Sequence, residues 1–201
     1  MEGEEYEAPL SIHECRRRAP LHFLAKADNA RIAARVLWDA AAGDHDGIVA
    51  AIGYGGTPHV ALHEAFLREA SLAIELILKG LVAQRLEMGV SKLPNLRPSN
   101  THDLLRLWDD AELEKPARED HQTLFIARKV LQWAGRYAAP TKDTYFDSQA
   151  EEEESLRDYE PNMSVNVLKT RSISWEQFDA VYALPSAAFW ELRNQPDPAT
   201  T

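Results

Sequence analysis

The longest stretch of helical periodicity covers residues 57–87 and constrains the fold more than any other feature of the chain. Thr57 suits the N-cap of a helix, and Pro58 fits the first helical position, where no backbone donor is needed. The apolar residues that recur at steps of three and four, and so share one face of a helix, are Leu62, Phe66, Ala70, Ala73, Ile74, Ile77 and Leu81. Such a face needs neighbouring helices to cover it, so this stretch predicts the core helix of a bundle.

The opposite side of the same stretch is polar. At about 100° per residue, one stripe contains Glu64, Arg68, Ser71, Glu75 and Lys79. Opposite charges stand four residues apart at Glu64/Arg68 and at Glu75/Lys79, a spacing that stabilises helices. Periodicity alone therefore places Glu75 and Lys79 on a solvent-facing stripe.

Two further helices are predicted on either side of this one. Residues 20–43 are alanine-rich, and their helical register aligns Leu21, Leu24, Ala25, Ile32, Val36, Leu37 and Ala40. The glycine-rich residues 43–58 predict a loop that includes one helical turn. A short helix at 101–113 is indicated by Thr101 or Asn100 as cap, and by the inward-facing residues Leu104, Leu107, Trp108 and Ala111.

Two more helices are predicted towards the C-terminus. Pro116 fits a first helical position, and the helix that it opens ends before Pro140. Its expected stripe consists of Leu124, Ala127, Leu131, Ala134 and Ala138, with Ile126, Val130, Trp133 and Tyr137 beside it. Ser174 and Gln177 form a capping-box pattern, which predicts a helix from Trp175 to about Leu184, with Phe189 and Trp190 docking as a final turn.

These elements predict an all-α protein, an up-and-down bundle of four to five helices with a C-terminal helical extension. We expect a polar N-terminal arm at 1–18, a bundle at 19–140, and an acidic loop followed by a helix that packs on the bundle at 141–201. The acidic run 151–154 belongs to that loop, and residues 165–168 suit a brief extended segment.

Composition limits the function classes. The formal charge of −10 disfavours nonspecific nucleic-acid binding by the molecule as a whole, although a local basic face is compatible with it. With a single cysteine, Cys15, no internal disulfide can form, which fits a cytoplasmic protein. Neither a secretion signal nor a membrane-spanning segment is indicated. Cys15 stands beside three arginines, but without a nucleophile motif it is interpreted as a structural or incidental thiol.

A histidine pair provides a candidate metal site. His59 and His63 stand at i and i+4 at the start of the long helix, so both imidazoles can reach one ion, with Asp44, His45 or Asp46 as a third ligand. The pair lacks the intervening glutamate of a zincin motif. We therefore expect no metal and no cofactor, and keep a metal-dependent helical-bundle hydrolase built on His59 and His63 as an alternative.

Several segments taken together resemble the HEPN family of small helical bundles. The residues that carry the resemblance are Glu75 and Lys79 in AIELILKGL, His102-Asp103-Leu104 at the start of the third predicted helix, and Arg136-Tyr137 at the end of the fourth. The match covers about residues 20–140. It implies a four- or five-helix bundle, commonly a dimer, as found in RNA-cleaving toxins, defence systems and inactive accessory proteins. It also places Glu75 between helices, near Arg136 or Lys79, instead of in solvent.

The nuclease branch of that family has an arginine followed by a histidine five to seven positions later, at the end of the last core helix. Here Arg136 is followed by YAAPTKD, without a histidine. The same spacing at Arg97/His102, and at Arg16 or Arg17 with His22, lies outside the family's position for the pair.

These observations favour a catalytically inactive binding or accessory module, expected as a homodimer that binds RNA, a nucleotide or a partner protein in a defence or toxin–antitoxin setting. The alternative enzyme is a metal-independent ribonuclease in which Arg136 acts with His102 as a displaced base.

Overall fold

The computed structural model describes residues 11–94, 98–135 and 172–195, and every regular element in these ranges is a helix. The predicted all-α class is therefore confirmed. The elements are α1 (Ile12–Arg18), α2 (Pro20–Ala41), α3 (Asp46–Ile52), α4 (Pro58–Glu87), α5 (Leu104–Asp110), α6 (Arg118–Lys129), a π-helical turn η1 (Val130–Ala134) and α8 (Trp175–Arg193). Arg97, Arg136, Tyr137, the acidic run and residues 165–168 lie outside the described residues.

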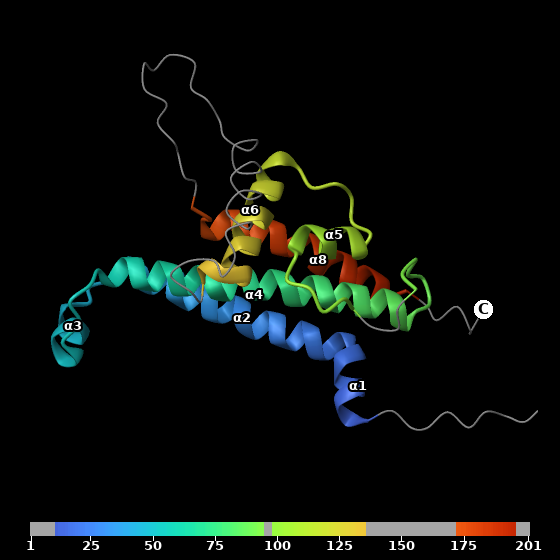
Figure 1. Cartoon of the computed structure of the whole chain (residues 1–201), viewed down its shortest axis with the longest axis horizontal. Coiled ribbons are helices and arrows are strands. Elements are labelled where there is room, and N and C mark those ends of the chain that lie inside the picture. The colour runs from blue at the N-terminus through green and yellow to red at the C-terminus, as the bar shows by residue number, and fades with distance from the viewer. Residues whose placement is uncertain (1–10, 95–97, 136–171, 196–201) are drawn as a thin grey trace, which may run out of the picture.

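Helices α2 and α4 run antiparallel along most of their length, with α3 in the connection between them (Figure 1). Alanines on α2 make the close approach possible, since Ala27, Ala30 and Ala34 are all buried. Opposite them, a Cβ added to Gly80 would lie 3.3 Å from the Phe23 Cβ and 3.6 Å from the Leu24 backbone nitrogen. Small residues on both sides thus let the two helices pack almost backbone to backbone.

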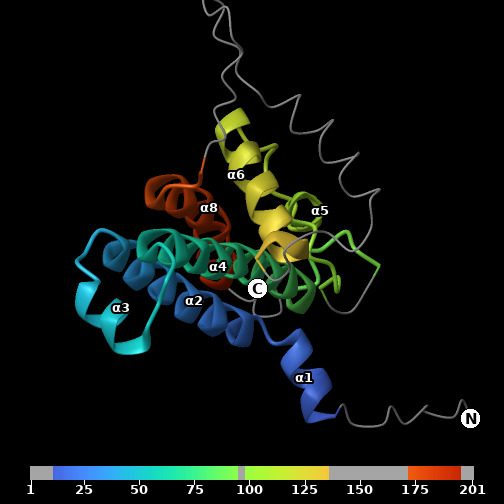
Figure 2. The same cartoon turned by 60° about the vertical axis from the view of Figure 1, so that its left-hand side comes forward.

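The last helix, α8, completes the core. It packs along α4 and also contacts α6 (Figure 2). Its Phe178 meets Phe66 of α4 edge to face at 6.3 Å between ring centroids. Tyr182 donates a 2.9 Å hydrogen bond to Asp28 of α2, and burial together with this bond raises the pKa of the phenol. A neighbouring ion pair, Arg31 to Asp179 at 2.6 Å, ties the same two helices.

The inward face predicted for α2 was wrong in part. Leu24 is buried, but Leu21, Ala25, Ile32 and Val36 are exposed. The physical reason is that α2 carries apolar residues on two faces, and the face with the smaller side chains packs against α4. The larger aliphatic residues of α2 therefore point away from the bundle.

Several predicted boundaries also change. Residues 12–18, predicted as part of an arm, form α1, and the predicted loop at 43–58 contains the two-turn helix α3. The N-cap of α5 is Asp103, so the prediction of Thr101 or Asn100 as the cap was wrong. Helix α8 begins at the capping box of Ser174 and Gln177 as predicted, but it continues through Pro185 to Arg193, so that Phe189 and Trp190 belong to it instead of to a separate turn.

The helix predicted from Pro116 begins two residues later, at Arg118. Its expected stripe is confirmed for Leu124, Ala127 and Leu131, which are buried, whereas Ala134 is exposed. The π-helical turn accounts for the change, because Gly135 donates its backbone N–H to the carbonyl of Val130, five residues earlier, at 2.9 Å. The wider turn takes the residues after Val130 out of the α-helical register.

Within the described ranges, no helix combines the length and the apolarity that crossing a membrane requires.

Candidate functional site

A carboxylate from the middle of α4 is the centre of the candidate site. Glu75 is buried, and its Oε1 accepts a 2.7 Å hydrogen bond from the Nζ of Lys79, one turn further along the helix. Lys79 is buried as well. Because an unpaired charge in such a position costs several kcal/mol, roughly 3–5, each side chain depends on the other.

A histidine from another part of the chain uses the second carboxylate oxygen. His102, in the segment just before α5, lies with its Nδ1 2.9 Å from the Oε2 of Glu75. A carboxylate only accepts hydrogen bonds, so Nδ1 is the donor in this contact. The His102 side chain is 49% exposed, whereas that of Glu75 is 6% exposed. The carboxylate is thus held inside the bundle while the imidazole reaches the surface.

Asp103 and Arg128 extend this arrangement to α5 and α6. The Oδ1 of Asp103 accepts from the backbone nitrogens of Leu105 and Arg106 at 3.2 and 3.3 Å, which caps α5. The same oxygen lies 3.7 Å from the Nη1 of Arg128. We call Glu75, Lys79, His102, Asp103 and Arg128 the Glu75 cluster. It joins α4, α5 and α6 at one place.

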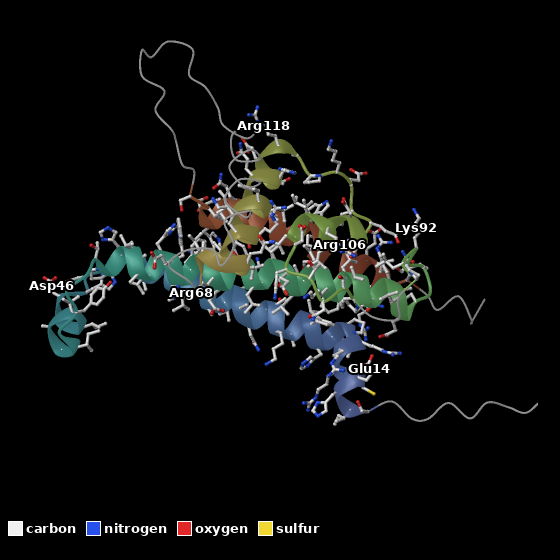
Figure 3. All side chains as sticks on the ribbon, in the orientation of Figure 1. Glu14, Asp46, Arg68, Lys92, Arg106 and Arg118 are labelled. Atoms are coloured by element: carbon white, nitrogen blue, oxygen red, sulfur yellow. The ribbon has the colours of Figure 1, made fainter. Side chains whose placement is uncertain are left out.

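The charges of the Glu75 cluster balance in pairs. The positive charge of Lys79 offsets the negative charge of Glu75, and that of Arg128 offsets Asp103. The imidazole of His102 is the most exposed side chain of the cluster. Arg106, exposed on the first turn of α5, stands four residues after His102 and lies near the middle of the bundle in Figure 3. The solvent-facing side of the cluster therefore presents the imidazole of His102, and the exposed guanidinium of Arg106 follows four residues later in the sequence.

The solvent-facing stripe predicted on α4 was wrong for three of its five residues. Glu64 and Arg68 are exposed, but Ser71, Glu75 and Lys79 are buried. Ser71 satisfies its hydroxyl by donating to the Leu67 carbonyl at 2.6 Å. The other helices cover α4 more completely in its second half than in its first, so polar residues there are buried and paired within the protein.

The family-motif residues are brought together only in part. Glu75, Lys79, His102 and Asp103, which are up to 28 positions apart, meet in the Glu75 cluster. Arg136 and Tyr137 lie outside the described residues.

Sequence reasoning missed Arg128, because nothing in the spacing of α6 relates it to α5. The capping role of Asp103 had a signal, an aspartate directly before the apolar run that opens at Leu104.

The histidine pair at the start of α4 is separate from the cluster. His59 is exposed, and the Nε2 of His63 forms a hydrogen bond with the hydroxyl of Ser172. The imidazole of His45, a predicted third ligand, contacts the carbonyl of Ala40 at 2.8 Å. Across the described residues, no group of three or more His, Cys, Asp and Glu side chains is arranged to hold a metal ion.

His63 gives the fold a pH dependence. It lies beside Trp38 and Phe66, and partial burial lowers its pKa below the usual value, against a smaller opposing effect of Glu64. The unfolded chain takes up this proton at a higher pH, about 6.5, so the unfolded state binds more protons as the pH falls. Stability is therefore expected to be highest above about pH 6.5 and to decrease below it.

Urea unfolding at pH 7.5 and 5.5 tests this expectation. His63→Gln should lose less stability between the two pH values than the unaltered protein, while His59→Gln, one turn earlier and exposed, should behave like the unaltered protein. An equal loss in all three proteins would show that His63 does not contribute.

Comparison with known proteins adds no identification, since the chain matches no family model, no curated protein and no solved structure.

Proposed function

We propose that the chain is a HEPN-like helical bundle that binds a phosphate-bearing ligand, RNA or a nucleotide, through the exposed side of the Glu75 cluster, without cleaving it. The observation that carries the proposal is the bridge that Glu75 makes between Lys79 and His102. It joins two of the segments on which the HEPN resemblance depends, and it holds an imidazole at the surface, four residues before the exposed Arg106.

Phosphate is the ligand chemistry that these groups favour. Arginine and histidine donate hydrogen bonds and interact favourably with anions. The acids of the cluster are occupied, Glu75 by Lys79 and His102, and Asp103 by the cap of α5 and by Arg128. With a formal charge of −10, the rest of the protein repels a polyanion, so binding would be confined to this face.

The missing nuclease histidine supports binding without cleavage. HEPN ribonucleases have their histidine shortly after the arginine that closes the last core helix, and the segment after Arg136 has none. The proposed role is therefore that of an accessory protein in a defence or toxin–antitoxin setting.

A second candidate is favoured by one specific contact. An imidazole whose Nδ1 is held by a carboxylate has a fixed orientation, and its Nε2 is then suited to accept a proton from a substrate hydroxyl. The 2.9 Å contact between His102 and Glu75 has this form. A metal-independent ribonuclease with His102 as its base would use the same face.

Binding assays separate these candidates. Fluorescence anisotropy with labelled single-stranded RNA, and competition by ATP, should detect binding that His102→Ala and Arg106→Ala each weaken by about tenfold. Lys26→Ala, an exposed cation on α2, is the matched control and should change the affinity less than twofold. The proposal would be contradicted if the protein bound neither RNA nor ATP. It would also be contradicted if Lys26→Ala lowered the affinity as much as His102→Ala and Arg106→Ala do.

The same RNA, recovered and run on a denaturing gel, reports on cleavage. Intact RNA is expected. Products that the unaltered protein forms and His102→Ala does not would establish the ribonuclease candidate instead.

A further inference from the structure

The outer face of α2 presents aliphatic side chains to solvent. Leu21, Ile32 and Val36 are 46%, 63% and 60% exposed, and Ala25 is exposed between them. Their spacing of four, seven and four residues places all four in one stripe along the helix, opposite the alanines that pack on α4. Exposed aliphatic residues that share one side of a surface helix, here on both sides of the polar Asp28 and Asn29, are typical of an interaction site. We call these four residues the outer stripe.

The outer stripe has the same spacing when it is read in either direction. An antiparallel copy of α2 would therefore set Leu21 against the partner's Val36, and Ala25 against the partner's Ile32. Such a contact is isologous, because both copies use the same patch around a twofold axis. The axis would pass between Asp28 and Asn29.

The elements at the two ends of α2 add charge complementarity. Helices α1 and α3 extend from opposite ends of α2, on the side away from α6 and α8 (Figures 1 and 2), and Figure 3 labels Glu14 and Asp46 at these two ends. Helix α1 carries Arg16, Arg17 and Arg18, whereas Asp44 lies just before α3 and Asp46 is the first residue of α3. An antiparallel arrangement brings each basic end to the partner's acidic end.

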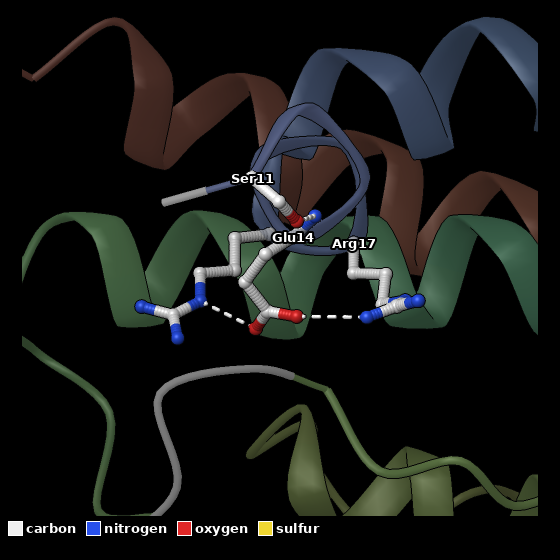
Figure 4. A network of polar contacts seen from close by, with 4 residues as sticks. Ser11, Glu14 and Arg17 are labelled. Carbon is white, nitrogen blue, oxygen red and sulfur yellow. Dashed lines mark hydrogen bonds and ion pairs between the residues drawn. The ribbon is translucent and has the colours of Figure 1, made fainter. Parts of the chain in front are cut away.

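Helix α1 is ordered in a way that suits this contact. Ser11 caps it by accepting from the backbone nitrogen of Glu14 at 3.2 Å. The carboxylate of Glu14 then holds Arg17 and Arg18, each at 2.9 Å (Figure 4). Arg16 is exposed and is not one of the arginines that Glu14 holds. The helix thus presents a fixed basic surface.

We propose that the outer stripe is the interface of a homodimer in which α2 packs antiparallel against α2 of a second copy, with α1 of each chain beside α3 of the other. The aliphatic residues supply the buried centre and the charges of α1 and α3 supply the rim, which is the common organisation of protein interfaces. A parallel pairing would bring like charges together at both ends. The interface is on α2 and needs no ligand, so it stands whether or not the Glu75 cluster binds phosphate.

Sedimentation equilibrium of the full chain tests the interface. The unaltered protein is expected to be a dimer, and the double variant Ile32→Glu/Val36→Glu should raise its dissociation constant by at least about 100-fold. Leu184→Glu on α8, a site as exposed as Leu21, is the matched control and should remain dimeric. Circular dichroism of all three proteins should show the same helix content, because the substituted residues are exposed. A monomeric unaltered protein, or a dimer that the double variant leaves intact, would overturn the proposal.

Cysteine cross-linking tests the direction of the helices. In a Cys15→Ser background, the double variant Ala25→Cys/Ile32→Cys should form a disulfide-linked dimer under copper phenanthroline oxidation. The single variant Ala25→Cys should form little disulfide-linked dimer. The two positions lie about 10 Å apart within one helix, so they cannot link intramolecularly. Efficient linkage by Ala25→Cys alone would indicate a parallel pair and would overturn the antiparallel arrangement.

Discussion

Glu75→Ala is expected to lower the free energy of unfolding by about 3–5 kcal/mol, the usual cost of removing one partner of a buried ion pair. The substitution leaves the Lys79 ammonium buried without its 2.7 Å partner and frees His102 from α4. Urea unfolding followed by circular dichroism measures the change. Because His102 begins the segment that leads into α5, the end of the bundle near α5 is expected to loosen first.

Two further variants show whether the charge itself is responsible. Glu64→Ala, on an exposed part of the same helix, should change stability by less than about 0.5 kcal/mol. Glu75→Leu combined with Lys79→Leu removes both charges and should recover most of the loss, since apolar residues often replace buried ion pairs without penalty. A loss below about 0.5 kcal/mol for Glu75→Ala would mean that Glu75 is solvated and that the Glu75 cluster does not form.

Phe66→Ala is also expected to lower the free energy of unfolding by about 3–5 kcal/mol, but through the loss of core packing. Phe66 is fully buried where three helices meet, with Trp38 of α2 at 4.9 Å and Phe178 of α8 at 6.3 Å between ring centroids. Alanine would leave a cavity and remove both ring contacts, each of which contributes about 0.5–1.5 kcal/mol beyond area burial.

Chemical denaturation with tryptophan fluorescence measures the Phe66 effect, because Trp38 lies in direct contact with the substituted ring. Leu72→Ala, on the same helix but 38% exposed, is the control and should be nearly neutral. A loss below about 1.5 kcal/mol for Phe66→Ala would indicate that the three helices do not share one packed core.

The positions of the helices could be predicted from local sequence. The face that each helix buries could not be predicted in every case. The proline at Pro58 and the capping box at Ser174 depend on neighbouring residues, so the starts of α4 and α8 could be predicted, although the Thr57 side chain makes no capping hydrogen bond. On α2, however, both faces carry apolar residues. Which face packs depends on Gly80, about 50 positions away, whose missing side chain favours the alanine face.

The candidate site was predictable in its parts but not in its geometry. A glutamate and a lysine four residues apart are usually a surface pair, and periodicity placed Glu75 and Lys79 there. Their burial becomes possible because His102, 27 residues later in the chain, satisfies the second carboxylate oxygen. In the structure Glu75 is buried, with Lys79 and His102 as its partners. Arg128 could not be related to Asp103 by any local pattern, since the two meet only through the packing of α6.

The position of α8 has a consequence for biosynthesis. The aromatic and aliphatic residues that it packs against α4 are made only when translation reaches residues 175–193, about 90 positions after α4 is finished. During that interval the nascent α2–α4 hairpin exposes the surface that Phe178, Val181, Tyr182 and Phe189 later cover. At typical elongation rates this lasts on the order of 5–20 s, long enough for chaperones to bind, and the core is completed only after α8 has been synthesised.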